Sequence, residues 1–328
     1  MSFRALTRWL GFTMGGVLLG LALWFALRGP SAPIDPREMP PPREGEVTIL
    51  FFGDGGDSSP LQRQVAASML EVCRRLGCSL ALLLGDNVYA SGPLNGSHDP
   101  RLDLAFGIPF APFAELDGFA FWGAFGNHDV LAGLSNEIGY AAGTPLLEIP
   151  GPMFEVTGLP AWLQVMAIYT PTLFKADPLL EGALTPDWES QVRRVENRMC
   201  AAGPVRWKIL FGHHPIYSTA HGTAKRLERR LLPTIRRCGV DFFLAGHVHQ
   251  QEHISAPDFE QLIQGAASNP RHSRGWFKWG PRSSFRSEEA GFGVIRFSQI
   301  RAWVNYFDRE GHILYSWQVS RARPPAGG

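Results

Sequence analysis

The most constraining stretch of this chain is a short apolar run that ends in a glycine and two histidines. Residues 240–245 are mostly apolar, and Gly246, His247, Val248 and His249 come directly after them. Such a run predicts a buried strand whose end opens into a cleft, the usual place for a ligand in an α/β sheet. On an extended backbone the two imidazoles would lie on one side, whereas a turn would direct them to two neighbouring ions. Taken alone, the pair indicates either a metal site or two structural histidines.

Four other apolar runs end in a similar way. Residues 47–52, 80–84, 119–125 and 205–211 lead into Gly53-Asp-Gly-Gly56, Gly85-Asp-Asn-Val-Tyr89, Gly126-Asn-His-Asp129 and Gly212-His-His-Pro215. The five strand ends together supply seven candidate metal ligands, namely Asp54, Asp86, Tyr89, Asn127, His213, His247 and His249. Carboxylate, amide, phenolate and imidazole donors suit first-row transition metals rather than calcium, which prefers oxygen alone. Seven ligands exceed the needs of one tetrahedral zinc and suffice for two ions if one carboxylate bridges them.

The order of elements favours an α/β fold. Ser59 is suited to be the N-cap of a helix with Pro60 at its first position, and apolar residues at helical spacing continue to Leu76, before Gly77. This strand–helix–strand order, with hydrophobic strands, predicts a largely buried sheet core. The sequence also predicts a strand over 162–169, a helix that starts at 185, a helix over about 223–237, and strands over 291–297, 301–307 and 313–319.

The N-terminal segment differs from the rest of the chain. Residues 9–27 carry no charge, and a helix of that length would span roughly 28 Å at about 1.5 Å per residue, near the thickness of a bilayer core. Arg4 and Arg8 precede the run, which favours a short cytoplasmic segment over 1–8, a transmembrane signal-anchor helix over 9–27, and export of the remaining chain to the periplasmic or extracellular side. A cleaved signal peptide is the alternative, although no good small-x-small site lies just after the apolar run.

Residues 28–45 are rich in proline and have little to bury. Their composition predicts a stiff, extended linker between the membrane helix and a catalytic domain over 46–320, with a flexible tail over 321–328.

Charge and cysteine content set further limits. The formal net charge is +1, which gives no sign of the broad cationic face of a nucleic-acid-binding protein. The four cysteines match no zinc-knuckle spacing. In an oxidising compartment they could form the disulfides Cys73–Cys78 and Cys200–Cys238, and buried free thiols are the alternative.

The five glycine-led motifs together resemble those of the calcineurin-like metallophosphoesterases, and among these the purple acid phosphatases of the small tartrate-resistant type. The resemblance covers roughly residues 46–319. Most metallophosphoesterases have a histidine ligand at the position of Gly56, and the purple subgroup instead binds ferric iron through a tyrosine at the position of Tyr89. The resemblance implies a two-sheet α/β sandwich of the β-α-β-α type, here preceded by a single N-terminal transmembrane helix.

The same resemblance implies two metal ions. Asp54, Asp86, Tyr89 and His249 would hold Fe(III), and Asp86, Asn127, His213 and His247 would hold a divalent Fe, Zn or Mn ion. Phenolate is a hard anionic donor, so it stabilises a trivalent ion. Two such cations lower the pKa of bound water, and the resulting metal-bound hydroxide would attack phosphorus in line.

Two further histidines are candidates for contact with the substrate. His128 stands where the family places a histidine that contacts phosphate and protonates the leaving group. His221 resembles a second substrate-side histidine, although its spacing from His213 is one residue shorter than in the mammalian pattern. His214 has a tyrosine counterpart in that pattern, and Asp129 is expected to orient its neighbours.

The sequence therefore predicts a membrane-anchored hydrolase of phosphomonoesters, of the acid phosphatase type, whose substrate is a phosphorylated small molecule or a phosphoprotein. The alternatives are a phosphodiesterase or nucleotide pyrophosphatase on the same metal site, and a non-catalytic module that binds phosphorylated ligands. Residues 271–286 are rich in basic and aromatic side chains, which predicts either a solvated loop or a lip that steers anionic substrates or rests on a membrane.

Overall fold

Two β-sheets carry the five motifs in the computed structural model of the chain, which describes residues 37–175, 184–201, 203–271 and 283–321. Sheet A has the order β16 (Ile313–Ser320), β15 (Arg301–Asp308), β14 (Gly291–Phe297), β1 (Val47–Phe52), β2 (Leu80–Leu83), β3 (Phe121–Gly123) and β4 (Leu147–Glu148). Sheet B has the order β13 (Ser283–Ser287), β11 (Gln251–Ser255), β12 (Glu260–Gln264), β10 (Phe242–Ala245), β7 (Trp207–Phe211), β6 (Leu163–Ala167) and β5 (Phe154–Glu155). The mixed α/β class and the two sheets agree with the prediction.

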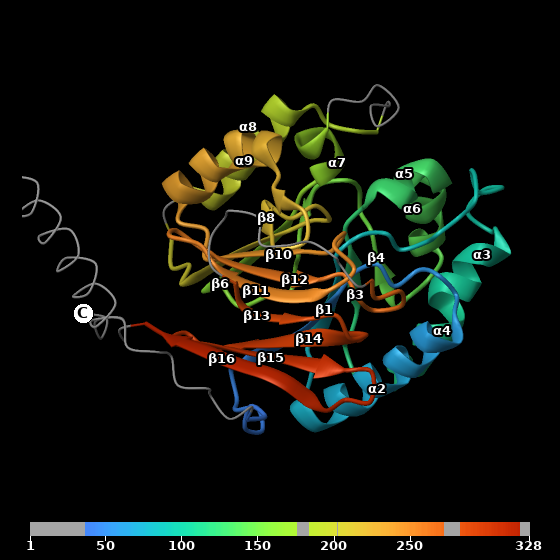
Figure 1. Ribbon diagram of the computed structural model, residues 1–328, viewed down its shortest axis with the longest axis horizontal. Helices are drawn as coiled ribbons and strands as arrows, with labels where there is room; N and C mark the ends of the chain where they lie inside the picture. Colours follow the sequence, from blue (N-terminus) through green and yellow to red (C-terminus); the bar gives the residue numbers. More distant parts are fainter. Residues whose placement is uncertain (1–36, 176–183, 202, 272–282, 322–328) are drawn as a thin grey trace, which may run out of the picture. The chain divides into compact units, whose positions relative to one another are not determined.

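Helices lie against both sheets. The longer ones are α2 (Pro60–Leu76), α6 (Leu134–Ala142), α8 (Trp188–Met199) and α9 (Lys225–Cys238). The shorter helical segments are α3 (Pro100–Leu102), η1 (Asp103–Gly107), α4 (Ile108–Phe110), η2 (Ala111–Glu115), α5 (Asn127–Ala132) and α7 (Thr170–Phe174), and β8 (Tyr217–Ser218) pairs with β9 (Gly222–Thr223). Figure 1 shows α8 and α9 side by side next to sheet B, with α2 next to sheet A.

The core lies between the sheets and beneath the helices, as β1 illustrates. Ile49 and Phe51 belong to a cluster that includes residues of both sheets, whereas Leu50 and Phe52 pack with Val65 of α2 and its neighbours. Alternate side chains of a strand point to opposite faces, so a strand buried on both faces is apolar throughout. This is why the predicted strands read as continuous apolar runs.

Several predicted elements are confirmed with small differences in their ends. The Ser59 side chain accepts a hydrogen bond from the Gln62 N–H at 3.1 Å, and Gly77 ends α2 in the left-handed conformation. The helix expected from residue 185 begins at Trp188, because the Asp187 side chain caps it by accepting from the Ser190 N–H. The helical segments over residues 100–115 were not predicted.

The end of the predicted linker packs against sheet A, so the expectation that it has little to bury is wrong at Met39. That side chain is 2% exposed, and its N–H donates to the Asn305 side chain at 2.9 Å. The Asn305 amide donates in turn to the Arg37 carbonyl at 2.9 Å, and Arg296 donates to the Pro40 carbonyl. Two buried side chains on β14 and β15 therefore hold this segment.

No helix within the described ranges is long and apolar enough to cross a membrane. The predicted transmembrane helix over 9–27 lies outside those ranges, as do the cytoplasmic segment over 1–8 and most of the predicted tail.

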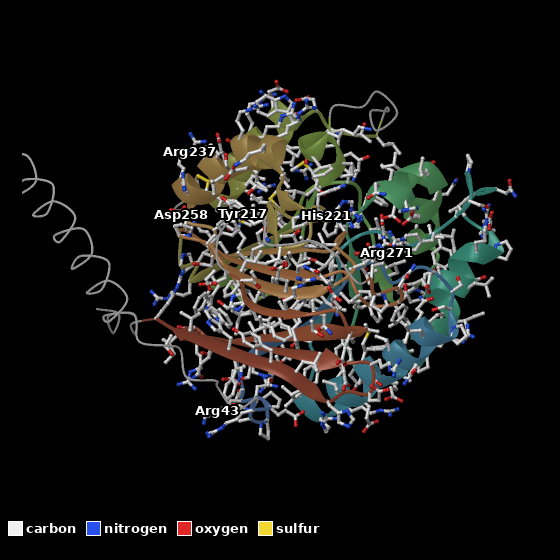
Figure 2. The ribbon with its side chains drawn as sticks, viewed as in Figure 1. Arg43, Tyr217, His221, Arg237, Asp258 and Arg271 are labelled. Carbon is white, nitrogen blue, oxygen red and sulfur yellow. A yellow bond between two sulfur atoms is a disulfide. The ribbon has the colours of Figure 1, made fainter. Side chains whose placement is uncertain are left out.

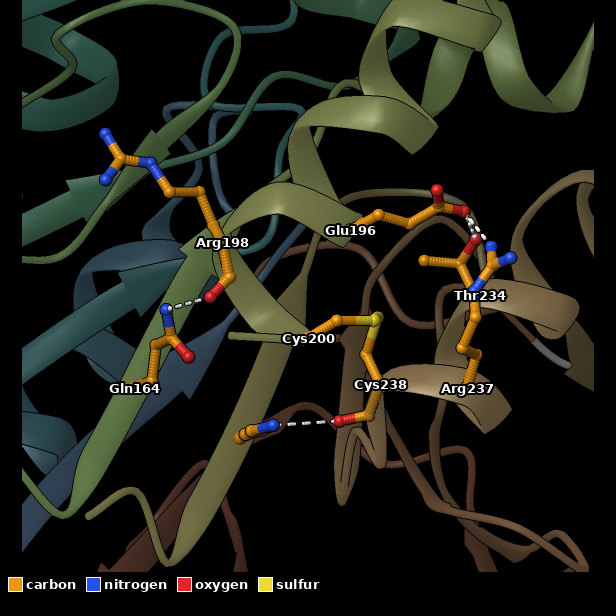
Figure 3. The surroundings of a disulfide bond; sticks show 8 residues. Gln164, Glu196, Arg198, Cys200, Thr234, Arg237 and Cys238 are labelled. Atoms are coloured by element: carbon orange, nitrogen blue, oxygen red, sulfur yellow. Dashed lines mark hydrogen bonds and ion pairs between the residues drawn. A yellow bond between two sulfur atoms is a disulfide. The ribbon is translucent and has the colours of Figure 1, made fainter. Parts of the chain in front are cut away.

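The four cysteines form two disulfides, which settles the alternatives that the sequence left open. Cys73 is bonded to Cys78 at the C-terminal end of α2, and Cys200 is bonded to Cys238. The second bond joins the ends of α8 and α9, next to a contact in which Glu196 accepts from Thr234 and Arg237 (Figure 3).

Candidate metal centre

The five predicted motifs lie at one edge of the two sheets. β1, β2 and β3 are parallel neighbours in sheet A, and β7 and β10 are parallel neighbours in sheet B. The carboxyl ends of parallel strands lie at the same edge, so the residues just after them converge. Ligand atoms of Asp54, Asp86 and His213 lie within 4.8 Å of one another.

The turns after the strands place several candidate ligands on unusual backbone. The φ angle is 56° at Asp54, 55° at Asp86 and 67° at His247, in the left-handed region that residues other than glycine rarely adopt. Strain of this kind concentrates at functional sites. The close approach of two turns also requires glycine, because a Cβ on Gly126 would lie 2.2 Å from Asp86 Oδ1.

Asp54, Tyr89 and His249 form one group of donors. The Tyr89 hydroxyl donates to Asp54 Oδ1 at 3.0 Å, and His249 Nε2 lies 3.4 Å from each of these two oxygens. His249 Nδ1 lies 2.6 Å from the Asn269 carbonyl, which accepts its proton. The Nε2 lone pair therefore faces Asp54 and Tyr89.

His213 is the centre of a second group. Its Nε2 atom lies 3.2 Å from Asn127 Oδ1, 3.3 Å from Asp86 Oδ2 and 3.3 Å from His247 Nδ1. Its Nδ1 atom lies 2.9 Å from the Leu84 carbonyl, and a hydrogen bond there makes Nε2 the nitrogen that the neutral ring would offer to a metal. All seven predicted ligands are thus brought together in two adjoining groups.

The electrostatics of the two groups oppose a second buried negative charge beside that of Asp86. Burial raises the pKa of Asp54 to about 8, with the nearby charge of Asp86 adding to the effect. Burial alone would lower the pKa of His213, but the charges of Asp86 and Asp54 raise it to about 9. Burial raises the pKa of Asp86, but the charge of His213 and its hydrogen bond outweigh burial and hold the pKa below its ordinary value. A cation between these groups would balance their charge, so the donor set fits a metal site.

Burial and the charge of Asp54 also raise the pKa of Tyr89 above its ordinary value. In this environment the phenolate form needs a cation beside it, because two carboxylates oppose a further negative charge.

Asp129 orients the turn that carries Asp86, as predicted. Its carboxylate is fully buried and accepts the backbone N–H groups of Asp86, Asn87 and Gly126 at 2.8, 2.7 and 2.6 Å. A carboxylate with three such donors cannot also turn toward the ligand group, so its role is to fix the backbone.

Gly56 leaves no room for a side chain. A Cβ there would lie 2.1 Å from the carbonyl oxygen of Asn87, and the Gly56 carbonyl accepts the Tyr89 N–H at 3.0 Å. This contact places Tyr89 beside Asp54, so the glycine and the tyrosine depend on each other structurally.

His128 and His221 lie at the more exposed side of the two groups. The ring of the half-buried His128 lies 4.5 Å from that of Tyr89, and its backbone N–H donates to Asp86 Oδ1 at 2.9 Å. The exposed His221 (Figure 2) has its ring 5.7 Å from that of His247. Both predicted substrate-side histidines are therefore next to the predicted ligands.

His214 lies beside the predicted ligands, and Thr170 was not predicted as part of the site. The His214 ring is 4.4 Å from that of His247 and stacks on Phe174 at 4.3 Å. Thr170 Oγ1 accepts the N–H groups of His213 and His214 and lies 3.0 Å from His214 Nδ1. Thr170 comes shortly after β6, the strand predicted over 162–169, and no local sequence pattern distinguishes its hydroxyl as part of a site.

The predicted loop over 271–286 is described only at its ends. The backbone N–H of Arg271 (Figure 2) donates to the His249 carbonyl at 3.0 Å. Burial lowers the pKa of His249, and the positive charge of the Arg271 side chain adds to this effect. Residues 272–282 lie outside the described ranges, so both alternatives for this loop, a solvated loop and a lip, stay open.

Comparison with known proteins gives consistent results. A family profile for calcineurin-like phosphoesterases matches residues 47–251, which include all seven predicted ligands. Purple acid phosphatase 17 of Arabidopsis thaliana is 28% identical over 308 residues, which cover 86% of this chain and 87% of that protein. Tartrate-resistant acid phosphatase type 5 of Homo sapiens is 25% identical over 267 residues, covering 76% and 82%. The solved structure of GAP50, described as the anchor in the inner membrane complex of Plasmodium, has a TM-score of 0.73 at 18% identity and covers 85% of this chain and 90% of that one.

Proposed function

Because the chain belongs to the calcineurin-like phosphoesterase family and is a hydrolase of phosphoric esters, we propose that it is a purple acid phosphatase-like enzyme that hydrolyses phosphomonoesters with two metal ions. The observation that carries this proposal is the convergence of Asp54, Asp86 and His213 within 4.8 Å, each with further donors beside it. A structural site would not need seven donors at the ends of five strands.

In this proposal the two groups of donors would hold one ion each, with Asp86 shared. Asp54, Asp86, Tyr89 and His249 would hold Fe(III), which the phenolate favours, and Asp86, Asn127, His213 and His247 would hold a divalent Fe, Zn or Mn ion. When bound, two such ions supply Lewis acidity, which polarises a phosphoryl group and increases the acidity of water.

The side chains at the open side would bind and orient the substrate. His128 is half-buried, and its backbone hydrogen bond to Asp86 and its ring contact with Tyr89 restrict its position. It could donate a proton to the oxygen of the leaving group, which lowers the barrier to breaking the P–O bond. His221, whose ring lies beside that of His247, could hydrogen-bond to a phosphoryl oxygen and spread the charge that develops there.

We further propose that the enzyme is exported and tethered to a membrane by residues 9–27. The uncharged N-terminal run and the preceding arginines support the tether. The two disulfides are typical of an oxidising compartment and support export. The tether would end where Asn305 and Arg296 hold residues 37–40 against sheet A.

A non-catalytic anchoring role is the second candidate function, and the similarity to GAP50 supports it. GAP50 is described as an anchor, and its structure covers most of this chain. A protein of this fold can thus serve attachment. For the present chain, the complete donor set supports turnover instead.

One preparation tests these proposals together. The full-length protein would be purified in detergent, its Fe, Zn and Mn content measured, its visible spectrum recorded, and its hydrolysis of p-nitrophenyl phosphate compared with that of bis(p-nitrophenyl) phosphate. We expect about two metal ions per chain and preferred hydrolysis of the monoester. Preferred hydrolysis of the diester would indicate a phosphodiesterase, and bound phosphate without turnover by metal-loaded protein would indicate a binding or anchoring role.

A further inference from the structure

The segment that carries His221 is held from below by buried polar side chains of sheet B. We name residues 216–221 the His221 loop. Gln261 of β12, which is fully buried, accepts the N–H groups of Ile216 and Tyr217 at 2.9 and 3.1 Å, and its amide donates to the Tyr217 carbonyl at 2.5 Å. The first half of the loop is therefore fixed through its backbone.

Glu252 of β11 holds the second half of the loop. Its carboxylate accepts the Thr219 N–H, at 3.1 Å to one oxygen and 3.3 Å to the other, and the Gln250 side-chain amide at 2.8 Å. Thr219 is two residues before His221, whose own N–H donates to Ser218 Oγ at 2.8 Å. Glu252 is thus connected to His221 through the short backbone turn over residues 218–221, which the Ser218 hydroxyl closes.

Among the described residues, the burial of the Glu252 carboxylate is compensated by hydrogen bonds rather than by a cationic partner. Glu252 is fully buried, and within the described ranges no lysine or arginine forms an ion pair with it. Burying an acid without a cationic partner is unfavourable unless hydrogen bonds compensate it. A carboxylate accepts at both oxygens and donates at neither, so it can hold the Thr219 N–H and the Gln250 amide at once.

We propose that Glu252 is a positioning residue that holds His221 at the substrate side of the metal centre. This inference rests on the proposed function, in which His221 contacts the phosphoryl group. His221 is exposed, and its ring lies 5.7 Å from that of His247. Ser218 closes the turn that carries His221, and Glu252 holds that turn to sheet B through Thr219, so loss of the Glu252 carboxylate would release the backbone that carries the ring.

A double-mutant cycle tests the coupling. The cycle compares wild type, His221→Ala, Glu252→Ala and the double variant. A displacement of a catalytic group by about 1 Å can reduce turnover about 100-fold, so we expect Glu252→Ala to lower kcat by about that factor. In the His221→Ala background the same change should alter kcat less than about 2-fold, because the residue that it positions is already gone. Equal effects in both backgrounds would overturn the proposal.

Two further variants separate positioning from general damage to the fold. Glu252→Gln should retain kcat within about 3-fold, because the Gln250 amide, whose oxygen has no partner in the described structure, can turn over and accept from the new amide. Glu260→Ala is the matched control, since its carboxylate contacts His253 in the same sheet at 2.9 Å. It should leave kcat unchanged.

A readout without turnover distinguishes failure of this inference from failure of the proposed function. The full-length protein would be labelled with ¹⁵N-histidine and its NMR spectrum recorded. The ring signal of His221 is identified as the one that disappears in His221→Ala. We expect this signal to shift in Glu252→Ala and to stay in place in Glu260→Ala. An unmoved signal in a folded Glu252→Ala protein overturns the positioning role, whereas absence of ester hydrolysis by wild type overturns only the proposed function.

Discussion

His213 Nε2 lies 3.3 Å from Asp86 Oδ2, and neither side chain is more than 2% exposed. The two charges form a pair in the interior, with Asp54 within 4.8 Å of both. One imidazolium cannot neutralise two carboxylates, so Asp54 keeps its proton to a higher pH, with a pKa of about 8. These bound protons determine how the stability of the metal-free protein should respond to pH.

The metal-free protein should lose stability as the pH rises from 6.5 to 9. Asp54 has a pKa raised to about 8 and His213 a pKa raised to about 9, so the folded state keeps protons in this range that the unfolded chain has released. Stability therefore falls as the pH increases. Asp54→Asn removes one of these groups and should make the fall shallower, as measured by thermal unfolding of chelator-treated full-length protein. Asp117→Asn, at an exposed position, should keep the wild-type slope. Equal slopes for wild type and Asp54→Asn would contradict the prediction.

Tyr89→Phe should remove any visible charge-transfer band. The ring of the variant can still pack on His128, 4.5 Å away, so the fold should be kept while the phenolate is lost. Without that hard anionic donor the site should also retain less Fe(III). Visible spectra and metal analysis check both effects. Tyr140→Phe is the control, because the Tyr140 hydroxyl contacts Asp103, outside the donor groups. A band that persists in Tyr89→Phe would mean that the phenolate is wrongly assigned.

Gly56→Ala should lower both stability and metal binding. The added Cβ would lie 2.1 Å from the Asn87 carbonyl, so the backbone that positions Asp86 and Tyr89 must move. Overpacking of this kind typically costs about 1–3 kcal/mol. Gly92→Ala meets nothing within 4 Å and should change neither property. Thermal unfolding and metal content would be measured for both variants, and a stable, fully loaded Gly56→Ala protein would show that the turn can adjust.

The strand ends could be predicted from the sequence because each has a local signal, an apolar run that ends in glycine and a polar side chain. Asp54, Asp86 and His213 come after such runs, and the parallel order of the strands brings them together. The resemblance to a known family then divided the ligands between two ions.

The residues that support the ligands could not be predicted in the same way. Thr170 accepts hydrogen bonds from the backbone of His213 and His214, more than 40 positions away in the chain. Glu252, on β11, accepts a hydrogen bond from the backbone of Thr219, which is 33 positions away. Hydrogen bonds between distant segments leave no periodic pattern in either segment. The packing of Met39 was missed for the same reason, because its partner Asn305 lies near the other end of the chain.

Loss of the Cys200–Cys238 bond should destabilise the protein more than loss of Cys73–Cys78. The Cys200–Cys238 bond joins residues 38 positions apart, and the Cys73–Cys78 bond joins residues 5 positions apart. A disulfide lowers the entropy of the unfolded chain, and this effect grows with the length of the loop that it closes. The expected loss of unfolding free energy on removing the bond is about 4 kcal/mol for the longer loop and about 2 kcal/mol for the shorter one. Denaturant unfolding of Cys200→Ser/Cys238→Ser and Cys73→Ser/Cys78→Ser proteins would measure both values. If the shorter loop had the larger effect, local packing rather than chain entropy would dominate.

His128→Asn should impair hydrolysis in proportion to how poorly the leaving group departs. The His128 backbone is held by Asp86 and its ring by Tyr89, so the substitution removes the imidazole proton without loosening the ligands. General acid catalysis contributes about 100- to 10,000-fold, and its contribution is largest when the leaving oxygen is basic. We therefore expect a loss of at least about 100-fold for an alkyl phosphate and a smaller one for p-nitrophenyl phosphate, whose leaving group needs no proton. His98→Asn, at an exposed position, should behave as wild type with both esters. An equal loss with the two esters would show that His128 binds phosphate but does not protonate the leaving group.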